Sequence, residues 1–416
     1  MKALVLKELG GPLILEDVPM PQPGPGEVLV RVRACGLRLT LVWNRNGRGG
    51  ASGKLPRIIG HEVAGDVTEV GPYVDGFNPG DRVNVYDYLI CGHCRWCDQG
   101  RDDLCEHQAS VVGRQIDGGL AEYVKLPARN LCHLPPEISY VDTAVTADAI
   151  ATPVHVVRER AQPKAPDTVL VVGAGGGVGI HMVQMAKVLG ASQVIAVDIT
   201  AEKLALAQQN SADSVINVLE VGFDEEALRL TKGHGVDIVV EMVGVTDTLE
   251  RSLRSLGKGG RLVWVGTYDG QAMLPVTQEA LRGECLLMGS RYCARHELAE
   301  AVELVARGRI RPAVTRLCQL EEADAVLWQR IEASSHLPEQ VYWPCLPPPP
   351  AADGAEVGAR GDHAPALDEP GYHHHPLALT GGGERSYPNT ESRAVYSKNK
   401  AHFLRRGQTT HREGYP

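Results

Sequence analysis

The chain has 416 residues, a length that allows two or three domains of ordinary size. Hydrophobic residues make up 43% and charged residues 22%, values typical of a globular protein with a buried core. The net charge of −9 argues against a nucleic-acid or membrane partner, and no apolar run is long enough to cross a bilayer. Because the first residues also lack the apolar stretch of a signal peptide, we expect a cytoplasmic protein.

Residues 1–150 carry short β patterns separated by turns. Alternation of apolar and polar residues over 28–33, and more loosely over 62–70, predicts strands. Clusters of Gly and Pro interrupt these patterns. We therefore predict a small, irregular, mostly antiparallel β domain.

Four of the ten cysteines crowd into one short segment, at Cys91, Cys94, Cys97 and Cys105. In a cytoplasmic chain this crowding indicates a metal site instead of disulfides or isolated thiols. Four thiolates can close a tetrahedral shell around zinc, while an iron–sulfur cluster is the chemical competitor because ferredoxins use similar spacing. A closed shell has no open coordination position, so the predicted metal is structural.

From about residue 165 the pattern changes to strands that alternate with helices. Apolar runs predict strands at 169–172, 194–197, 215–218, 236–240, 261–265 and 285–288. Helical spacing covers 181–189 and 201–209, and an amphipathic helix at 295–307 follows the last strand. The prediction is an α/β fold with a doubly wound parallel sheet.

A glycine cluster joins the first of these strands to the first helix. Its members are Gly173, Gly175, Gly176, Gly177 and Gly179, with Val178 inside the run. The simple Gly-x-Gly-x-x-Gly register from Gly173 ends on Val178, so the register Ala174-x-Gly176-x-x-Gly179 fits better. Glycines between a strand and a helix let the backbone approach a pyrophosphate, which predicts a dinucleotide site.

Asp198 ends the second strand of this unit, 19 residues after Gly179. A carboxylate there can accept both ribose hydroxyls and repels a 2′-phosphate, which favours NAD over NADP. Lys203 lies close by and keeps NADP as the alternative. A helix N-cap is the other interpretation of Asp198.

Residues 341–416 hold ten Pro and nine Gly but only nine Leu, Ile, Val and Phe together. Such a segment buries too little apolar area to offset the entropy cost of ordering. We predict a disordered tail over residues 344–416 and assign it no function.

The segment Gly60-His61-Glu62 resembles the Gly-His-Glu signature of the zinc-dependent medium-chain alcohol dehydrogenase family, and the cysteine and glycine motifs follow in that family's order. The resemblance covers about residues 1–340. It implies a GroES-like catalytic domain over 1–151 and 291–343, with the zinc lobe at 91–105, and a Rossmann NAD-binding domain over 152–290. It also implies a small alcohol or carbonyl substrate and a homodimer or homotetramer.

In that family a second, catalytic zinc is held by a Cys, a His and a third Cys, Glu or Asp. The His corresponds to His61, with Glu62 as an occasional ligand, and the third position corresponds to Asp148. Arg38 stands where the Cys ligand is expected, and a guanidinium cannot bind zinc. We expect an ion pair of Arg38 with Asp148 or Glu62 to replace the catalytic zinc.

Other family positions near Arg38 are also changed. Leu39 and Trp43 replace histidines that meet the cofactor phosphate and end the proton relay, while the relay hydroxyl of Thr40 is retained. Thr40 is either that relay group or a turn residue. Cys35 is either a substitute zinc ligand or a buried core thiol. The family's closing strand and a phosphate-binding arginine are expected to be missing after His336.

The leading functional prediction is an NAD-dependent oxidoreductase of the zinc-containing alcohol dehydrogenase type, which transfers hydride between an alcohol or polyol, or its carbonyl, and nicotinamide. A zinc-free reductase of carbonyl or C=C groups, from the same superfamily, is the second hypothesis. A catalytically silent dinucleotide-binding protein is the third, because the changes concentrate at 38–43 while the cofactor turn is intact.

Overall fold

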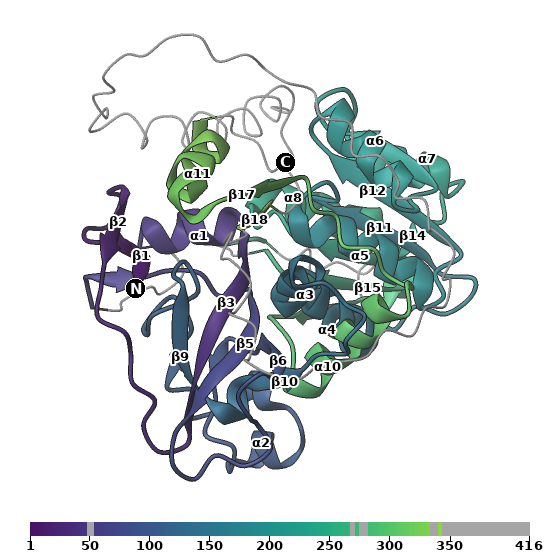
Figure 1. Ribbon diagram of the computed structural model, residues 1–416. Helices are drawn as coiled ribbons and strands as arrows, with labels where there is room; N and C mark the ends of the chain where they lie inside the picture. The colour runs from purple at the N-terminus through teal and green to yellow at the C-terminus, as the bar shows by residue number, and fades with distance from the viewer. Residues whose placement is uncertain (48–53, 267–270, 274–281, 333–339, 343–416) are drawn as a thin grey trace, which may run out of the picture. The chain divides into compact units, whose positions relative to one another are not determined.

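Two sheet systems organise the chain in the computed structural model (Figure 1). The structure describes residues 1–47, 54–266, 271–273, 282–332 and 340–342. All of these belong to one unit that includes Met1–Pro344. The predicted disordered tail, 344–416, lies outside the described residues.

The N-terminal part is mostly antiparallel, as predicted. One sheet has the order β2-β1-β4, a larger one runs β10-β6-β5-β3-β18-β17 with β9 also paired to β3, and β7 pairs with β8. The strands are β1 (Lys2–Leu6), β2 (Leu13–Asp17), β3 (Glu27–Leu37), β4 (Arg57–Ile58), β5 (Val63–Val70), β6 (Arg82–Val85), β7 (Tyr88–Leu89), β8 (Ser110–Val111), β9 (Tyr123–Pro127), β10 (Leu131–His133), β17 (Arg316–Cys318) and β18 (Gln340–Tyr342).

Helices close this part and lead out of it. They are α1 (Leu39–Arg45), α2 (Arg95–Asp98), α3 (Tyr140–Val145), the π-helical turn η3 (Thr146–Ile150), α4 (Ala151–His155), the π-helical turn η4 (Val156–Ala161), α10 (Arg295–Ala306) and α11 (Ala323–Glu332), with short 3₁₀ turns η1 (Asp102–Leu104), η2 (Ala128–Asn130) and η5 (Leu320–Glu322). Such π-helical turns are rare and are frequently found at functional sites.

The second sheet is parallel and has the strand order β13-β12-β11-β14-β15-β16. Its elements are β11 (Thr168–Val172), α5 (Gly177–Val188), β12 (Gln193–Asp198), α6 (Ala201–Gln209), β13 (Ser214–Asn217), α7 (Phe223–Leu230), β14 (Val236–Glu241), α8 (Thr246–Ser255), β15 (Leu256–Trp264) and β16 (Leu286–Gly289). The order reverses between β11 and β14, the point where doubly wound sheets bind ligands.

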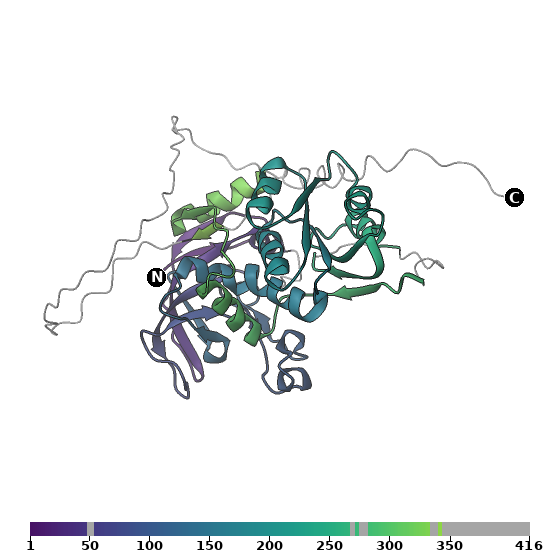
Figure 2. The ribbon, with the colours of Figure 1, turned by 90° about the vertical axis from the view of Figure 1, so that its right-hand side faces the viewer.

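Both faces of the parallel sheet are buried. On β11, Val169 and Val171 pack into one core with residues of α5, while Leu170 and Val172 pack into a second core with residues of α7. This alternation follows from the two-residue period of a strand, and a strand covered on both faces is apolar throughout. The second view shows the helices on either side of the sheet (Figure 2). The predicted doubly wound parallel sheet is confirmed.

The expectation of a missing closing strand is wrong. β18 pairs antiparallel with the end of β3, where Val341 lies opposite Gly36 and Tyr342 opposite Cys35. Three residues suffice because β17 pairs with the other side of β18. The strand therefore lies against the segment that leads directly to Arg38.

Among the described residues, none of the helices combines the length and the apolar character needed to span a bilayer.

Candidate functional site

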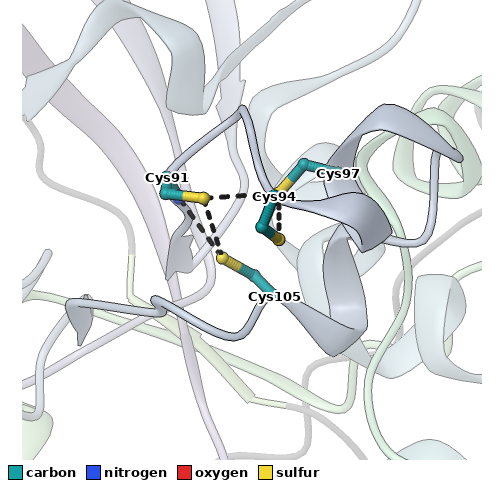
Figure 3. Close-up of side chains that lie close together, drawn as sticks. All are labelled: Cys91, Cys94, Cys97 and Cys105. Carbon is teal, nitrogen blue, oxygen red and sulfur yellow. Dashed lines mark hydrogen bonds between the residues drawn. The ribbon is translucent and has the colours of Figure 1, made fainter.

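The four predicted cysteine ligands come together in the loop that follows β7 (Figure 3). The Sγ atom of Cys94 lies 3.6 Å from that of Cys97, and the Sγ atom of Cys105 lies 3.6 Å from that of Cys91. The sulfurs of Cys91 and Cys97 are 3.9 Å apart. A tetrahedral shell with Zn–S bonds of about 2.3 Å has sulfur–sulfur edges of about 3.8 Å. The sulfurs are spaced for one ion, because an iron–sulfur cluster holds its thiolates farther apart.

One thiol of this lobe is already suited to bind zinc before the metal arrives. Backbone hydrogen bonds, foremost that of Cys97, lower the pKa of the Cys94 thiol to about 6. This sulfur is therefore a thiolate at neutral pH, the form that binds metal. Four thiolates leave no open coordination position, so the ion that fits here is structural.

We expect Cys97→Ser to reduce the zinc content of the lobe from one ion per chain to none. The free energy of unfolding should fall by at least about 3 kcal/mol, a modest share of the roughly 10–16 kcal/mol that structural zinc supplies in zinc-finger peptides. Mass spectrometry of the metal and thermal unfolding measure both effects. Cys132→Ser, a thiol in β10 outside the lobe, is the matched control, and an equal loss of zinc in that variant would contradict the assignment.

The glycine turn lies between β11 and α5, as predicted. Gly173 adopts a φ of +87°, which favours glycine. A Cβ on Gly175 would lie 2.4 Å from the Cβ of Lys203, and one on Gly179 would lie 2.1 Å from the Gly173 carbonyl oxygen. The close approaches within the protein therefore fall on Gly175 and Gly179, and Gly176, the other glycine of the predicted register, is the N-cap of α5.

The backbone at this turn is open to a pyrophosphate. Helix α5 begins at Gly177, followed by Val178, and the first N–H groups of a helix have no partner within it. The helix dipole also favours negative charge at this end. A Cβ at Gly176 would have no atom nearer than 3.5 Å, so the turn offers room where the phosphates of a dinucleotide lie.

Gly179→Ala should destabilise the fold by about 1–3 kcal/mol, because its Cβ meets a backbone oxygen that cannot move aside. NADH affinity should fall with it. Chemical unfolding and fluorescence titration are the measurements. Gly176→Ala is the control, and its free energy of unfolding should stay within about 1 kcal/mol of the wild type.

Asp198 is held at the end of β12, next to the glycine turn. Its Oδ2 accepts the N–H of Gly175 at 2.8 Å and its Oδ1 accepts the N–H of Ile199 at 2.8 Å. The ammonium of Lys203 lies 3.3 Å from Oδ1, and both side chains are buried. The N-cap of α6 is Thr200, so the N-cap interpretation of Asp198 is wrong.

The predicted catalytic residues converge in a second group, which we call the guanidinium cluster: Arg38, His61, Glu62 and Asp148. Nη1 of Arg38 lies 2.8 Å from Glu62 Oε1 and 2.8 Å from Asp148 Oδ2. Arg38 therefore pairs with both expected carboxylates instead of one. The cluster joins the start of α1, the residues before β5 and the turn η3.

Asp148 is ionised in this surrounding. Burial alone would raise its pKa, but the Arg38 charge, the His61 ring and the Thr152 hydroxyl together hold the pKa well below its usual range. Thr152 donates to Asp148 Oδ1 at 2.5 Å. Glu62 Oε1 accepts a second hydrogen bond, from the N–H of Ala149 at 3.1 Å.

His61 is buried and neutral at pH 7. Burial lowers its pKa, the Asp148 carboxylate opposes this, and the charges of Arg38 and Arg114 lower it further. Nε2 lies 3.4 Å from Asp148 Oδ2, but within the described part of the chain neither ring nitrogen has a hydrogen-bond partner. The imidazole is therefore able to bind an atom of a ligand.

A catalytic zinc does not fit the guanidinium cluster. His61, Glu62 and Asp148 could supply ligand atoms, since these lie within 4.8 Å of one another. However, Nη1 of Arg38 already bridges the two carboxylates, and its permanent charge repels a second cation. Cys35 does not complete the set, because its buried Sγ faces Gly60 and Gly119 in the core.

Two further residues of this region were not predicted. Thr152 binds Asp148 from a position four residues along the chain, an i, i+4 spacing that the sequence could have suggested. Arg114, whose charge acts on His61, comes from the loop after β8, and no local pattern points to it. Thr40 lies in the first turn of α1, two residues after Arg38.

Comparison with known proteins places this architecture in a family. Residues 24–136 match the alcohol dehydrogenase GroES-like domain, and residues 177–307 match the zinc-binding dehydrogenase family. An NAD-dependent alcohol dehydrogenase of Sulfolobus acidocaldarius is 34% identical over 335 residues, covering 79% of this chain and 95% of that protein. An acryloyl-coenzyme A reductase of Metallosphaera sedula is 35% identical over 332 residues, covering 78% and 94%.

The crystal structure of the alcohol dehydrogenase from Aeropyrum pernix has a TM-score of 0.76 and 34% identity, covering 83% of this chain and all of that one. The two matched ranges include the four cysteines and most strands of both sheet systems. The chain belongs to the zinc-binding, medium-chain alcohol dehydrogenase family.

Proposed function

We propose that this NAD-dependent oxidoreductase of the alcohol dehydrogenase type transfers hydride without a catalytic zinc ion. The substrate is an alcohol or polyol, or the corresponding carbonyl compound. The observation that carries the proposal is the position of Arg38 Nη1, 2.8 Å from both Glu62 and Asp148. A resident cation thus occupies the place between the carboxylates that a metal would take.

The residues of the cluster have distinct roles in this mechanism. NADH, when bound at the glycine turn, would supply hydride to the carbonyl carbon, and negative charge would develop on the substrate oxygen. Arg38 stabilises that charge electrostatically, and a preorganised donor of this kind supplies about 3–4 kcal/mol. The neutral ring of His61 and the hydroxyl of Thr40 orient the oxygen, while Asp148 and Glu62 hold the guanidinium in place.

Reduction of an activated C=C bond is the second candidate function. The same permanent positive charge of Arg38 would stabilise an enolate oxygen, which forms when hydride adds to a conjugated alkene. The similarity to an acryloyl-coenzyme A reductase supports this reading. Catalytic silence, the third hypothesis, requires that neither class of substrate be turned over.

Zinc and NAD are the cofactors of the protein, and we assign each to a place. Cys91, Cys94, Cys97 and Cys105 hold one structural zinc, whose role is to fold the lobe. The glycine turn and the first turn of α5 bind the pyrophosphate of NAD, and Asp198 accepts the ribose hydroxyls. Lys203 is then a partner of Asp198 and is not used to bind a 2′-phosphate.

We assign residues 1–151 and 291–343 to the GroES-like catalytic domain and 152–290 to the Rossmann domain; the family matches at 24–136 and 177–307 support the order of the two domains. A homodimer or homotetramer is supported by the edge strand β16, where Leu286 is 54% exposed and the adjoining Trp264 is 39% exposed. The four-thiolate site favours a reducing compartment, and so a cytoplasmic location.

The zinc content of the purified chain, together with its turnover, tests the proposal. We expect one zinc ion per chain and NADH oxidation with members of a panel of small aldehydes, ketones and conjugated enals. Two zinc ions per chain would contradict a metal-free mechanism. One zinc ion and NADH binding without any turnover would favour the silent protein.

A further inference from the structure

Asp87 is a buried carboxyl group for which the mechanism above has no use. It lies between β6 and β7 and is 4% exposed. Its N–H donates to the hydroxyl of Tyr292 at 3.2 Å, and its carbonyl accepts the N–H of Val112 at 2.9 Å. Among the described residues, its carboxylate Oδ1 has no hydrogen-bond partner. A buried polar atom without a partner costs free energy, so this oxygen calls for a functional explanation.

One tyrosine hydroxyl connects Asp87 to the guanidinium cluster. The hydroxyl of Tyr292 accepts the N–H of Asp87 and donates to the carbonyl of Ala147 at 2.9 Å. Ala147 is the residue before Asp148 in the turn η3. Asp87 is therefore held beside the turn that presents Asp148 to Arg38.

Burial, more than the surrounding charges, brings the pKa of Asp87 close to neutral pH. Burial and the Asp148 carboxylate raise the pKa of Asp87 to about 7, against the opposing effects of Arg114, Tyr292 and Arg291. The titratable groups that face it are Arg114, Asp148, Arg291, Tyr292 and Cys293, with Tyr86 and Tyr88 flanking it in the chain. Burial raises the pKa of the three tyrosines and of Cys293, so these remain uncharged.

The reaction also needs a group that exchanges a proton with the substrate oxygen. Trp43 carries no titrating group, and the hydroxyl of Thr40 does not by itself exchange a proton near pH 7. Arg38 stays protonated at physiological pH, and Asp148 stays ionised because its pKa is held low. Among the described residues near η3, Asp87 has a carboxyl whose pKa is raised to about 7, so it can change charge near neutral pH.

We propose that Asp87 is the catalytic acid and base that exchanges the substrate proton, an inference that rests on the function proposed above. In reduction, hydride leaves C4 of the nicotinamide and bonds to the carbonyl carbon, while the substrate oxygen takes the proton of the Asp87 carboxyl. The products are the alcohol, the oxidised nicotinamide and the Asp87 carboxylate, which solvent reprotonates. In oxidation, the carboxylate accepts the alcohol proton as hydride leaves.

The test compares the full-length wild-type chain with Asp87→Asn, using NADH and the fastest carbonyl substrate of the panel. We expect kcat for reduction by the wild type to fall as the pH rises through about 7, because Asp87 loses its proton there. Asp87→Asn should lose this pH dependence and about 100-fold in kcat. The NADH dissociation constant should stay unchanged, which also reports that the variant is folded.

Two controls keep the result specific to Asp87. Asp87→Glu retains a titrating carboxyl and should recover a pH limb at a shifted position, even where the Asn variant folds poorly. Asp224→Asn changes a buried carboxyl of α7 that pairs with Arg251, away from the cluster, and should keep the wild-type pH limb. A carboxylic-acid C=O band in the infrared spectrum of the wild type should titrate near pH 7 and be absent in Asp87→Asn.

The outcomes separate this inference from the function on which it rests. Suppose the wild type holds one zinc ion per chain and reduces a substrate, but kcat of Asp87→Asn still falls with rising pH as it does in the wild type. That result would overturn the role of Asp87 and leave the proposed function standing. A wild type that binds NADH but reduces none of the substrates would overturn the proposed function, and the role of Asp87 with it.

Discussion

Arg38→Cys should raise the zinc content from one to two ions per chain. The new thiolate would join His61 and Asp148 as the three protein ligands that a catalytic zinc requires. Without zinc, the variant should lose about 3–5 kcal/mol of unfolding free energy, because Glu62 and Asp148 keep their burial but lose their cation. With zinc, stability should return, and alcohol oxidation should exceed the wild-type rate at least about 10-fold, since bound zinc lowers the pKa of the substrate oxygen.

Arg33→Cys is the matched control for this experiment. Arg33 also pairs with a carboxylate, that of Asp66 at 2.6 Å, but it lies on β3 away from the cluster. Its zinc content should stay at one ion per chain, and its stability should not respond to added zinc. If Arg38→Cys also stays at one ion, or if the wild type already holds two, the account of Arg38 as a resident cation is wrong.

Asp198→Asn should reduce the preference for NAD over NADP by about 100-fold. The ribose hydroxyls lose a charged acceptor, and NADP no longer meets a carboxylate; a change of about 3 kcal/mol corresponds to this factor. The ammonium of Lys203, 3.3 Å from Asp198 Oδ1, is also released to meet the 2′-phosphate. The ratio of kcat/KM for the two cofactors measures the effect.

Two variants make the cofactor experiment specific. Asp213→Asn removes another carboxylate near the parallel sheet, one that pairs with Lys187. This variant should leave the ratio of kcat/KM for NAD and NADP unchanged. The double variant Asp198→Asn with Lys203→Ala should lose most of the gain in NADP affinity. If the ratio of kcat/KM for NAD and NADP is unchanged in Asp198→Asn, then Asp198 only stabilises the glycine turn, through its hydrogen bond with the N–H of Gly175.

Local patterns were sufficient to find the cysteine and glycine motifs. The cysteine spacing predicted a metal site because short loops leave the sulfurs little freedom, and the structure brings the four sulfurs within 4.8 Å of one another. The glycine turn was found because strand, turn and helix are consecutive in the chain. The sequence did not show why position 175 has to be glycine, because the side chain that a Cβ there would meet is that of Lys203, on the next helix.

The closing strand was missed for a related reason. β18 has three residues and a weak strand pattern of its own, and it exists because β3 and β17 pair with it on either side. Pairing between distant segments can outweigh local preference, which a reading of local composition does not capture.

The sequence by itself determined the fold class, both cofactor motifs and the substitution of Arg38 for a ligand cysteine, because each depends on residue type and short-range spacing. Only the tertiary structure decided what Arg38 does. Its contacts with Glu62 and Asp148 depend on how β3, β5 and η3 assemble, and no periodicity encodes that assembly. The same holds for Asp87, which meets Tyr292 across 205 residues of chain, and whose burial and charged surroundings exist only in the folded protein.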